Sequence, residues 1–311
     1  MDETHVVAHA AHRVPENENR IRAAASAASP YTRAWKRFAG DRIALIALTV
    51  ALFVLLFCLG APLVSHLITH RGPADQVLLD RFTPPFTHGY ILGADNLGRD
   101  ELTRLAYGGR VSITVALLAT LSALMLGATL GALAGYVGGW FDATVMRLTD
   151  VFLAIPVLVL LLFIASLRTF GPYSLALVIA GVSWMSLARL VRAEVLSLRR
   201  RDWVEAARVA GASDWRIVGR HLLPQTAPLI IVWAALTVPS FIIVEATLSF
   251  LGLGIQVPEP SWGNMLNDAQ KFYAQSWTLA FIPGAAIYVT VLAINLLGQG
   301  LRDALDPRLG R

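Results

Sequence analysis

Six long apolar runs, separated by polar segments, dominate the pattern of this 311-residue chain. Each run reaches the roughly 20 residues that a helix needs to cross the ~30 Å hydrocarbon core of a bilayer. None shows the short alternating pattern that is typical of a membrane β-barrel strand. The sequence therefore predicts an all-α, polytopic transmembrane helical bundle with six spans, at about residues 43–64, 111–136, 144–167, 174–196, 226–252 and 277–300.

The polar segments between these runs predict the rest of the organisation. Residues 1–42 combine a tail without apolar periodicity and, from residue 31, a basic and aromatic stretch typical of a helix on a membrane surface. The first span starts too late and is too long for a cleaved signal peptide, so we interpret it as an anchor. Residues 65–110 form the first segment outside the membrane. Residues 111–300 form the core, with a polar loop at about 197–224, and residues 301–311 form the C-terminus.

The distribution of Lys and Arg predicts the orientation. Six spans place both termini on the same side. If that side is the cytoplasm, 19 of the 26 basic residues lie inside and seven outside, as the positive-inside rule requires. The exceptions cluster beside the second span, at Arg99, Arg104 and Arg110, where nearby carboxylates partly balance them. We therefore expect a multi-pass protein of the inner (plasma) membrane, surrounded by lipid, with cytoplasmic termini.

Composition excludes several other classes of protein. The pI near 9.7 is explained by basic cytoplasmic loops, and no compact basic domain lies outside the spans, so no nucleic-acid partner is predicted. Cys58 is the single cysteine, which rules out a disulfide within the chain. The histidines lack the Cys or carboxylate partners that would complete a metal site, so none is expected.

Gly127, Gly131 and Gly135 recur every four residues in the second predicted span. This spacing places the three glycines on one helix face, where they let a neighbouring helix approach closely. We interpret the stripe as a helix-packing surface without chemistry of its own.

A nucleotide-binding P-loop is missing from the chain. That loop needs Lys followed by Ser or Thr, but Lys36 is followed by Arg37 and Lys271 by Phe272. If the protein is ATP-driven, the ATPase must therefore be a partner, and the chain itself needs no cofactor and catalyses no reaction.

The polar loop at 197–224 predicts a compact surface knob. Residues 202–210 favour a short helix, with Glu205 near its positive N-terminal end. Gly211 permits a turn, Ser213 is suited to cap a second short helix, and Pro224 marks the return to the membrane. From the residues alone, a docking surface and an ordinary basic loop are equally good interpretations.

The same loop resembles the "EAA" loop of ABC importer permeases. That pattern starts with Glu-Ala-Ala, three residues of any type and Gly. Nine further residues then lead to an apolar residue, one residue of any type and Leu-Pro. His221 departs from the apolar position. Blocks at 88–100 (HGYILGADNLGRD), 248–256 (LSFLGLGIQ) and 295–307 (NLLGQGLRDALDP) are similar to the dipeptide, oligopeptide and nickel branch, second ("C"-type) subunit.

The resemblance implies the fold of a type I ABC importer permease and a set of partners. These are a second, different permease, two ATPase subunits that bind ATP and Mg, and an extracytoplasmic substrate-binding protein. The cargo it implies is a di- or oligopeptide, with a nickel chelate as the alternative. The residues it assigns to ATPase coupling are Glu205, Ala206, Ala207, Gly211, Asp214, Leu223 and Pro224.

Two further places are candidate sites. Glu245 is the one carboxylate deep in a late span, where a charge costs on the order of 2.5–3.5 kcal/mol, so it should face the bundle interior or a partner. Its role is either structural pairing or a place in the translocation path. Asp95, Arg99 and Asp100 form either a locked turn with a capped surface helix or an outer gate.

A transporter or channel driven by an ion gradient is the rival of another class. It predicts several paired charges within the membrane. The sequence offers Glu245, with Asp150 and Arg147 nearer a helix end, as candidates for such pairs.

Overall fold

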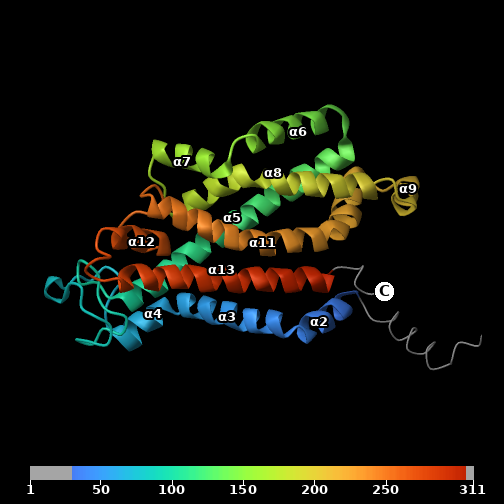
Figure 1. The fold of residues 1–311 in the computed structure, drawn as a ribbon. Helices are drawn as coiled ribbons and strands as arrows, with labels where there is room; N and C mark the ends of the chain where they lie inside the picture. The colour runs from blue at the N-terminus through green and yellow to red at the C-terminus, as the bar shows by residue number, and fades with distance from the viewer. Residues whose placement is uncertain (1–29, 306–311) are drawn as a thin grey trace, which may run out of the picture.

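One long helix, α5 (Glu101–Val137), crosses the molecule diagonally and contacts most of the other helices (Figure 1). At 1.5 Å per residue it is roughly 55 Å long, well beyond a bilayer core. The computed structural model describes residues 30–305, so most of the predicted N-terminal tail and the end of the C-terminal segment lie outside it. The described residues form an elongated all-α bundle, which confirms the predicted fold class.

The glycine stripe of α5 packs against α8 (Pro172–Leu198), as the spacing predicted. A Cβ added to Gly131 would lie 2.5 Å from the carbonyl oxygen of Ala188. At Gly127 and Gly135 it would lie 2.7 and 2.8 Å from the carbonyl oxygens of Trp184 and Arg192. The backbones of α5 and α8 therefore touch at three successive turns, and this pair forms the centre of the bundle.

Three other long helices surround this pair and expose most of their surface. They are α3 (Arg42–Leu59), α11 (Leu223–Phe250) and α13 (Thr278–Leu305). Their exposed side chains are mostly apolar, as expected for helices that face lipid or another membrane subunit. Within residues 30–305, five helices are long and apolar enough to span a membrane, and one bent pair would be a sixth.

That bent pair corrects the third predicted span. Instead of one helix over 144–167, the structure has α6 (Gly139–Leu153) and α7 (Val157–Leu167), which meet at 84°. Pro156 stands at the break. Proline donates no backbone hydrogen bond and disfavours helical geometry in the preceding residue, so a continuous helix is not formed there.

The second span also begins earlier than predicted. α5 starts ten residues before position 111, because the Asp100 side chain caps it by accepting a hydrogen bond from the Thr103 amide.

The remaining elements are short: α2 (Pro30–Gly40), α4 (Ala61–Leu63), a π-helical turn (Val64–Thr69), a 3₁₀ turn (Leu78–Asp80), α9 (Asp202–Val209), α10 (Asp214–Arg216), a second π-helical turn (Ile217–Leu222) and α12 (Trp262–Gln270).

The two ends of the bundle are formed by different elements. α2, α9 and the C-terminal end of α13 share one end, and the 65–100 segment and α12 share the other (Figure 1). The residues predicted to couple to an ATPase and those predicted to form an outer gate therefore lie at opposite ends of the molecule.

Candidate functional site

α9 is held against the bundle by a single buried side chain. Val204 is fully buried and packs with Ile217, Val218 and Leu222 from the turn that leads into α11. The rest of α9 projects beyond the ends of α8 and α11 (Figure 1), and Glu205 and Ala206 are exposed. The helix thus presents a surface to the outside while its base is fixed.

The turn after α9 is a Schellman motif, and Gly211 is its left-handed residue. Gly211 has a φ of +80°, and its amide donates to the carbonyl of Arg208 at 3.0 Å. The amide of Ala212 donates to the carbonyl of Ala207, also at 3.0 Å. This pair of bonds closes the helix C-terminus. Nothing lies within 4 Å of a Cβ at Gly211, so backbone conformation, not crowding, requires glycine here.

One polar contact connects this turn to α5, and a second lies within α9. The Tyr136 hydroxyl, at the end of α5, donates to Asp214 Oδ1 at 2.5 Å. Arg208 pairs with Glu205 at 2.8 Å on the exposed face of α9. The Tyr136 hydroxyl and then the Glu205 carboxylate raise the pKa of the Arg208 guanidinium above its usual value, so Arg208 stays charged.

The second helix of the predicted knob is not separate. α10, the π-helical turn and α11 follow one another without a break from Asp214 to Phe250. Ser213 stands at the N-cap position but its side chain makes no capping bond. Leu223 and Pro224 directly follow the π-helical turn and lie inside this continuous run, where Pro224 donates no backbone hydrogen bond. The prediction of a helix–turn–helix knob is therefore corrected to one short helix joined to a long one.

His221, the departure from the EAA pattern, contacts α9. Its ring lies 6.3 Å from the ring of Trp203. Trp203, Val209 and Trp215 are exposed around the turn, Val209 by 89%. Apolar side chains gathered at an exposed end of a molecule are typical of a protein-binding surface. Sequence reasoning missed this set, although three large apolar residues in an otherwise basic loop were the available signal.

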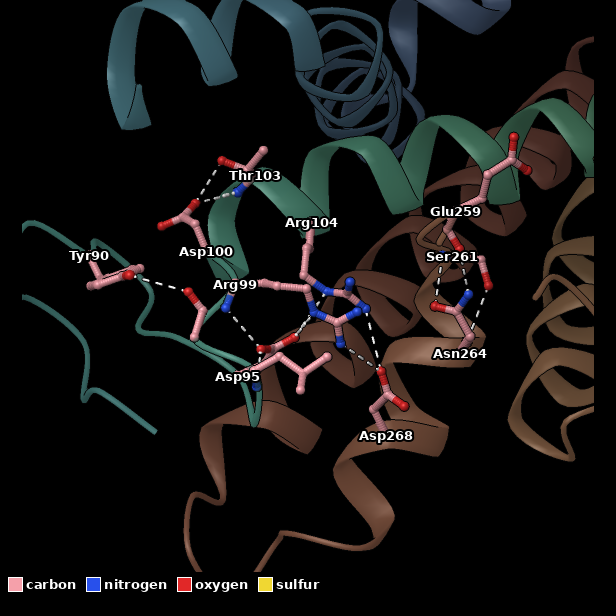
Figure 2. Close-up of polar contacts among 12 residues, drawn as sticks. Tyr90, Asp95, Arg99, Asp100, Thr103, Arg104, Glu259, Ser261, Asn264 and Asp268 are labelled. Carbon is pink, nitrogen blue, oxygen red and sulfur yellow. Dashed lines mark hydrogen bonds and ion pairs between the residues drawn. The ribbon is translucent and has the colours of Figure 1, made fainter. Parts of the chain in front are cut away.

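The other end of the bundle holds a buried cluster of charges (Figure 2). Asp95 Oδ2 accepts from Arg99 Nε at 2.5 Å, and Arg99 Nη2 donates to Asp268 Oδ2 at 3.1 Å. Arg104 is 1% exposed and lies 3.5 Å from both carboxylates. The predicted lock between Asp95 and Arg99 is thus present, and it extends to α12 through Asp268, which sequence reasoning missed.

The loop before α5 folds around Tyr90. The Tyr90 hydroxyl donates to Asp80 and to the carbonyl of Gly98, each at 3.2 Å, and Arg71 lies 3.8 Å over its ring. Burial raises the pKa of Tyr90, although Arg71 opposes this shift, so the hydroxyl remains a donor. A Cβ at Gly98, whose φ is +72°, would lie 1.9 Å from the carbonyl oxygen of Val77. The loop is therefore a packed structure and not an open excursion.

Glu245 is fully buried where α5, α11 and α12 meet. Its Oε1 accepts from the Ser249 hydroxyl at 2.7 Å, the Ser112 and Ser261 side chains lie nearby, and its Oε2 accepts no hydrogen bond from the described residues. The amide of Trp262 donates to Ser112 at 3.3 Å, which ties α12 to α5. Glu245 stands only five residues before the end of α11. It therefore lies nearer the C-terminal end of its span than the sequence suggested.

Charge pairs also join α6 to α8. Arg192 Nη2 donates to Asp142 Oδ2 at 2.6 Å, and Arg189 pairs with Asp150. The sequence offered Asp150 as a candidate but gave it no partner, because its partner lies 39 positions away. Within residues 30–305, no three His, Cys, Asp or Glu side chains gather in a way that could hold a metal ion.

Two family comparisons match the chain. The binding-protein-dependent transport system inner membrane component matches residues 127–311, and the N-terminal TM domain of oligopeptide transport permease C matches residues 29–85. The chain belongs to the binding-protein-dependent transport system inner membrane component family. It is thus an inner membrane component of a transport system, and the resemblance found in its motifs is confirmed.

Curated relatives cover nearly the whole chain. The glutathione transport system permease protein GsiD of Pectobacterium atrosepticum is 39% identical over 91% of this chain and 93% of its own length. The dipeptide transport system permease protein DppC of Bacillus subtilis is 37% identical over 95% and 92%. The di/tripeptide transport system permease protein DppC of Pseudomonas aeruginosa is 39% identical over 90% and 93%.

Proposed function

We propose that this chain is one of two permease subunits of an ATP-driven importer of di- and oligopeptides. Relatives that match it over more than nine tenths of their length carry the names of dipeptide, di/tripeptide and glutathione permeases, and glutathione is itself a tripeptide. The second permease, the binding protein that delivers the peptide and two ATPases that hold ATP and Mg complete the complex.

The surface of α9 docks onto an ATPase subunit. The observation that supports this most is the contrast between its two sides: Val204 is fully buried beneath, while Val209 and Trp215 are exposed by 89% and 75%. A rigid base and an exposed apolar tip suit a contact that must transmit force. Because α2 and the end of α13 share this end of the bundle, both termini are cytoplasmic.

α11 carries the movement from α9 to the outer end. The helical run from Asp214 to Phe250 has 37 residues, or roughly 55 Å at 1.5 Å per residue. It starts at the carboxylate that Tyr136 binds and passes Glu245 near its far end. Closure of the ATPases displaces α9, and α11 turns that displacement into a shift of α12. Only contacts that differ between the two states supply the driving free energy.

Glu245 helps to connect α11 to α5 and α12 in this arrangement and is not part of the peptide path. Its carboxyl group lies among serine side chains of three helices, and it is fully buried. A buried polar group without partners is costly, and the hydrogen bond from Ser249 offsets part of the cost of burying this carboxyl group.

Exchange of Gly211 tests the docking surface. Gly211→Val should abolish copurification of the ATPase while membrane insertion stays normal, because a non-glycine residue at positive φ costs about 1–2 kcal/mol and a β-branched one more. Gly219→Val is the matched control, since Gly219 lies in the next turn, has ordinary φ and has open space around it. Normal copurification with Gly211→Val would contradict the proposal.

Uptake by the reconstituted complex tests the cargo. Proteoliposomes that contain both permeases, the ATPases and the binding protein should accumulate dipeptides, glutathione or longer peptides only when ATP is present. A nickel chelate belongs in the same panel. Uptake of the chelate alone would replace the peptide cargo, and uptake driven by an ion gradient without ATP would overturn the importer mechanism.

A further inference from the structure

An apolar groove of about 350 Å³ lies between α2, α3 and α13, at the end of the bundle that also carries α9 (Figure 1). Its volume falls within the range of small-molecule sites, about 300–1,000 Å³. All its lining residues are apolar: Ala34, Trp35, Phe38, Leu48, Leu297, Leu301 and Ala304.

α2 forms one wall of the groove and is amphipathic. Phe38 is buried against α13, whereas Trp35 is 65% exposed at the mouth of the groove. Lys36 and Arg37 are exposed on the remaining faces of the helix. A short helix with basic residues on one side and aromatic residues on the other is suited to the plane where hydrocarbon meets headgroups. The groove therefore opens at the depth of the lipid headgroups.

The charges around the groove are mainly positive. Asp41 is the acidic residue between α2 and α3, and its carboxylate accepts from the amides of Ile43 and Ala44 at 2.9 and 3.3 Å. The positive N-terminal end of α3 thereby balances its charge. Asp303 is exposed and acidic. Against these two carboxylates stand three exposed cations: Lys36, Arg42 and Arg302.

We propose that this groove binds an anionic phospholipid. One acyl chain occupies the space between α2 and α13, and the phosphate group lies among the exposed cations. Lys and Arg residues beside the end of a transmembrane helix attract acidic lipid headgroups. A peptide suits the groove poorly, because only the indole of Trp35 offers its backbone a hydrogen bond. Placing the site in the cytoplasmic leaflet rests on the proposed orientation, but the binding itself does not.

Native mass spectrometry of the complete transporter tests the proposal. The purified complex is stripped of lipid and titrated with phosphatidylglycerol or with phosphatidylcholine of the same acyl chains. Phosphatidylglycerol should be retained preferentially. Leu301→Trp, which fills the groove, should remove this retention. Leu292→Trp should not, because Leu292 lies on the outer surface of the same helix, 42% exposed.

A second variant protects the test against misfolding. Arg42 and Arg302 are both exposed, so Arg42→Gln with Arg302→Gln leaves the core intact. A charge near a lipid surface changes affinity by about fivefold, so the double variant should bind phosphatidylglycerol about 25-fold more weakly. Arg168→Gln, a change of one exposed cation at the opposite end of the bundle, is the matched control and should bind normally.

Three results would overturn the proposal. They are equal retention of the two lipids, retention that survives both Leu301→Trp and the double Arg variant, and binding that appears only after residues 1–28 are removed. The last result would show that the chain's own N-terminal segment occupies the groove. Because bound lipid is counted directly, a failure of peptide transport does not affect the result.

Discussion

Replacing Gly131 by alanine should weaken the packing of α5 on α8. The added Cβ would lie 2.5 Å from the carbonyl oxygen and 2.9 Å from the Cα of Ala188. Both are backbone atoms, so neither moves away without a shift of the whole helix. Overpacking costs about 1–3 kcal/mol, and this site belongs at the upper end. Alanine regains about 1 kcal/mol of helix propensity, which leaves a net loss of about 2 kcal/mol.

The assay compares two glycine-to-alanine variants of the detergent-purified chain by thermal unfolding. Gly181→Ala is the matched control: it lies on α8, and a Cβ there has nothing within 4 Å, so it should gain about 1 kcal/mol. The expected difference of about 3 kcal/mol corresponds to roughly 5 °C in Tm for a chain of 311 residues. If the two variants melt at the same temperature within the scatter of the measurement, the close backbone contact does not contribute as the geometry indicates.

Three further predictions concern the outer loop, the charge cluster and the N-terminus. Gly98→Ala should destabilise the outer loop far more than Gly89→Ala, since both have positive φ but only Gly98 adds a backbone clash; equal sensitivity to limited proteolysis would contradict this. Asp268→Asn should cost about 3 kcal/mol, because two buried arginines lose a partner, whereas Glu259→Gln, at an exposed site, should leave the unfolding temperature unchanged; similar melting of both would refute it. Deleting residues 1–28 should leave ATP-dependent uptake intact, and inactivity of a well-expressed truncation would show that the tail is required.

Relations between residues close in sequence were predictable. The spacing of four placed Gly127, Gly131 and Gly135 on one face because the period of an α-helix is local. Gly211 marked a turn because a left-handed residue after a helix is usually glycine. Asp95 and Arg99 were expected to interact because glycines near Asp95 predicted a turn that Arg99 and Asp100 could lock.

Relations across the bundle were not predictable from one sequence. Arg99 meets Asp268 from 169 positions away, and nothing near Asp268 indicates that partner. Arg192 meets Asp142 from 50 positions away, and the apolar pattern gave no sign of the 84° bend after α6 apart from Pro156. The cluster of Arg99, Arg104 and Arg110, which departs from the positive-inside rule, was the one available hint. It indicated that carboxylates from elsewhere in the chain must pair with these arginines.

The π-helical turn at Ile217–Leu222 sets the rotational phase between the two ends of the protein. Such a turn holds one residue more than an α-helical turn, and each residue corresponds to about 100° of rotation. A single deletion in this turn would restore the regular helix and rotate all of α11 relative to α9. Glu245 would then turn away from α5 and α12 while the α9 surface stayed unchanged. The number of residues in this turn therefore determines whether a movement of α9 at one membrane face reaches the other face through a correctly rotated α11.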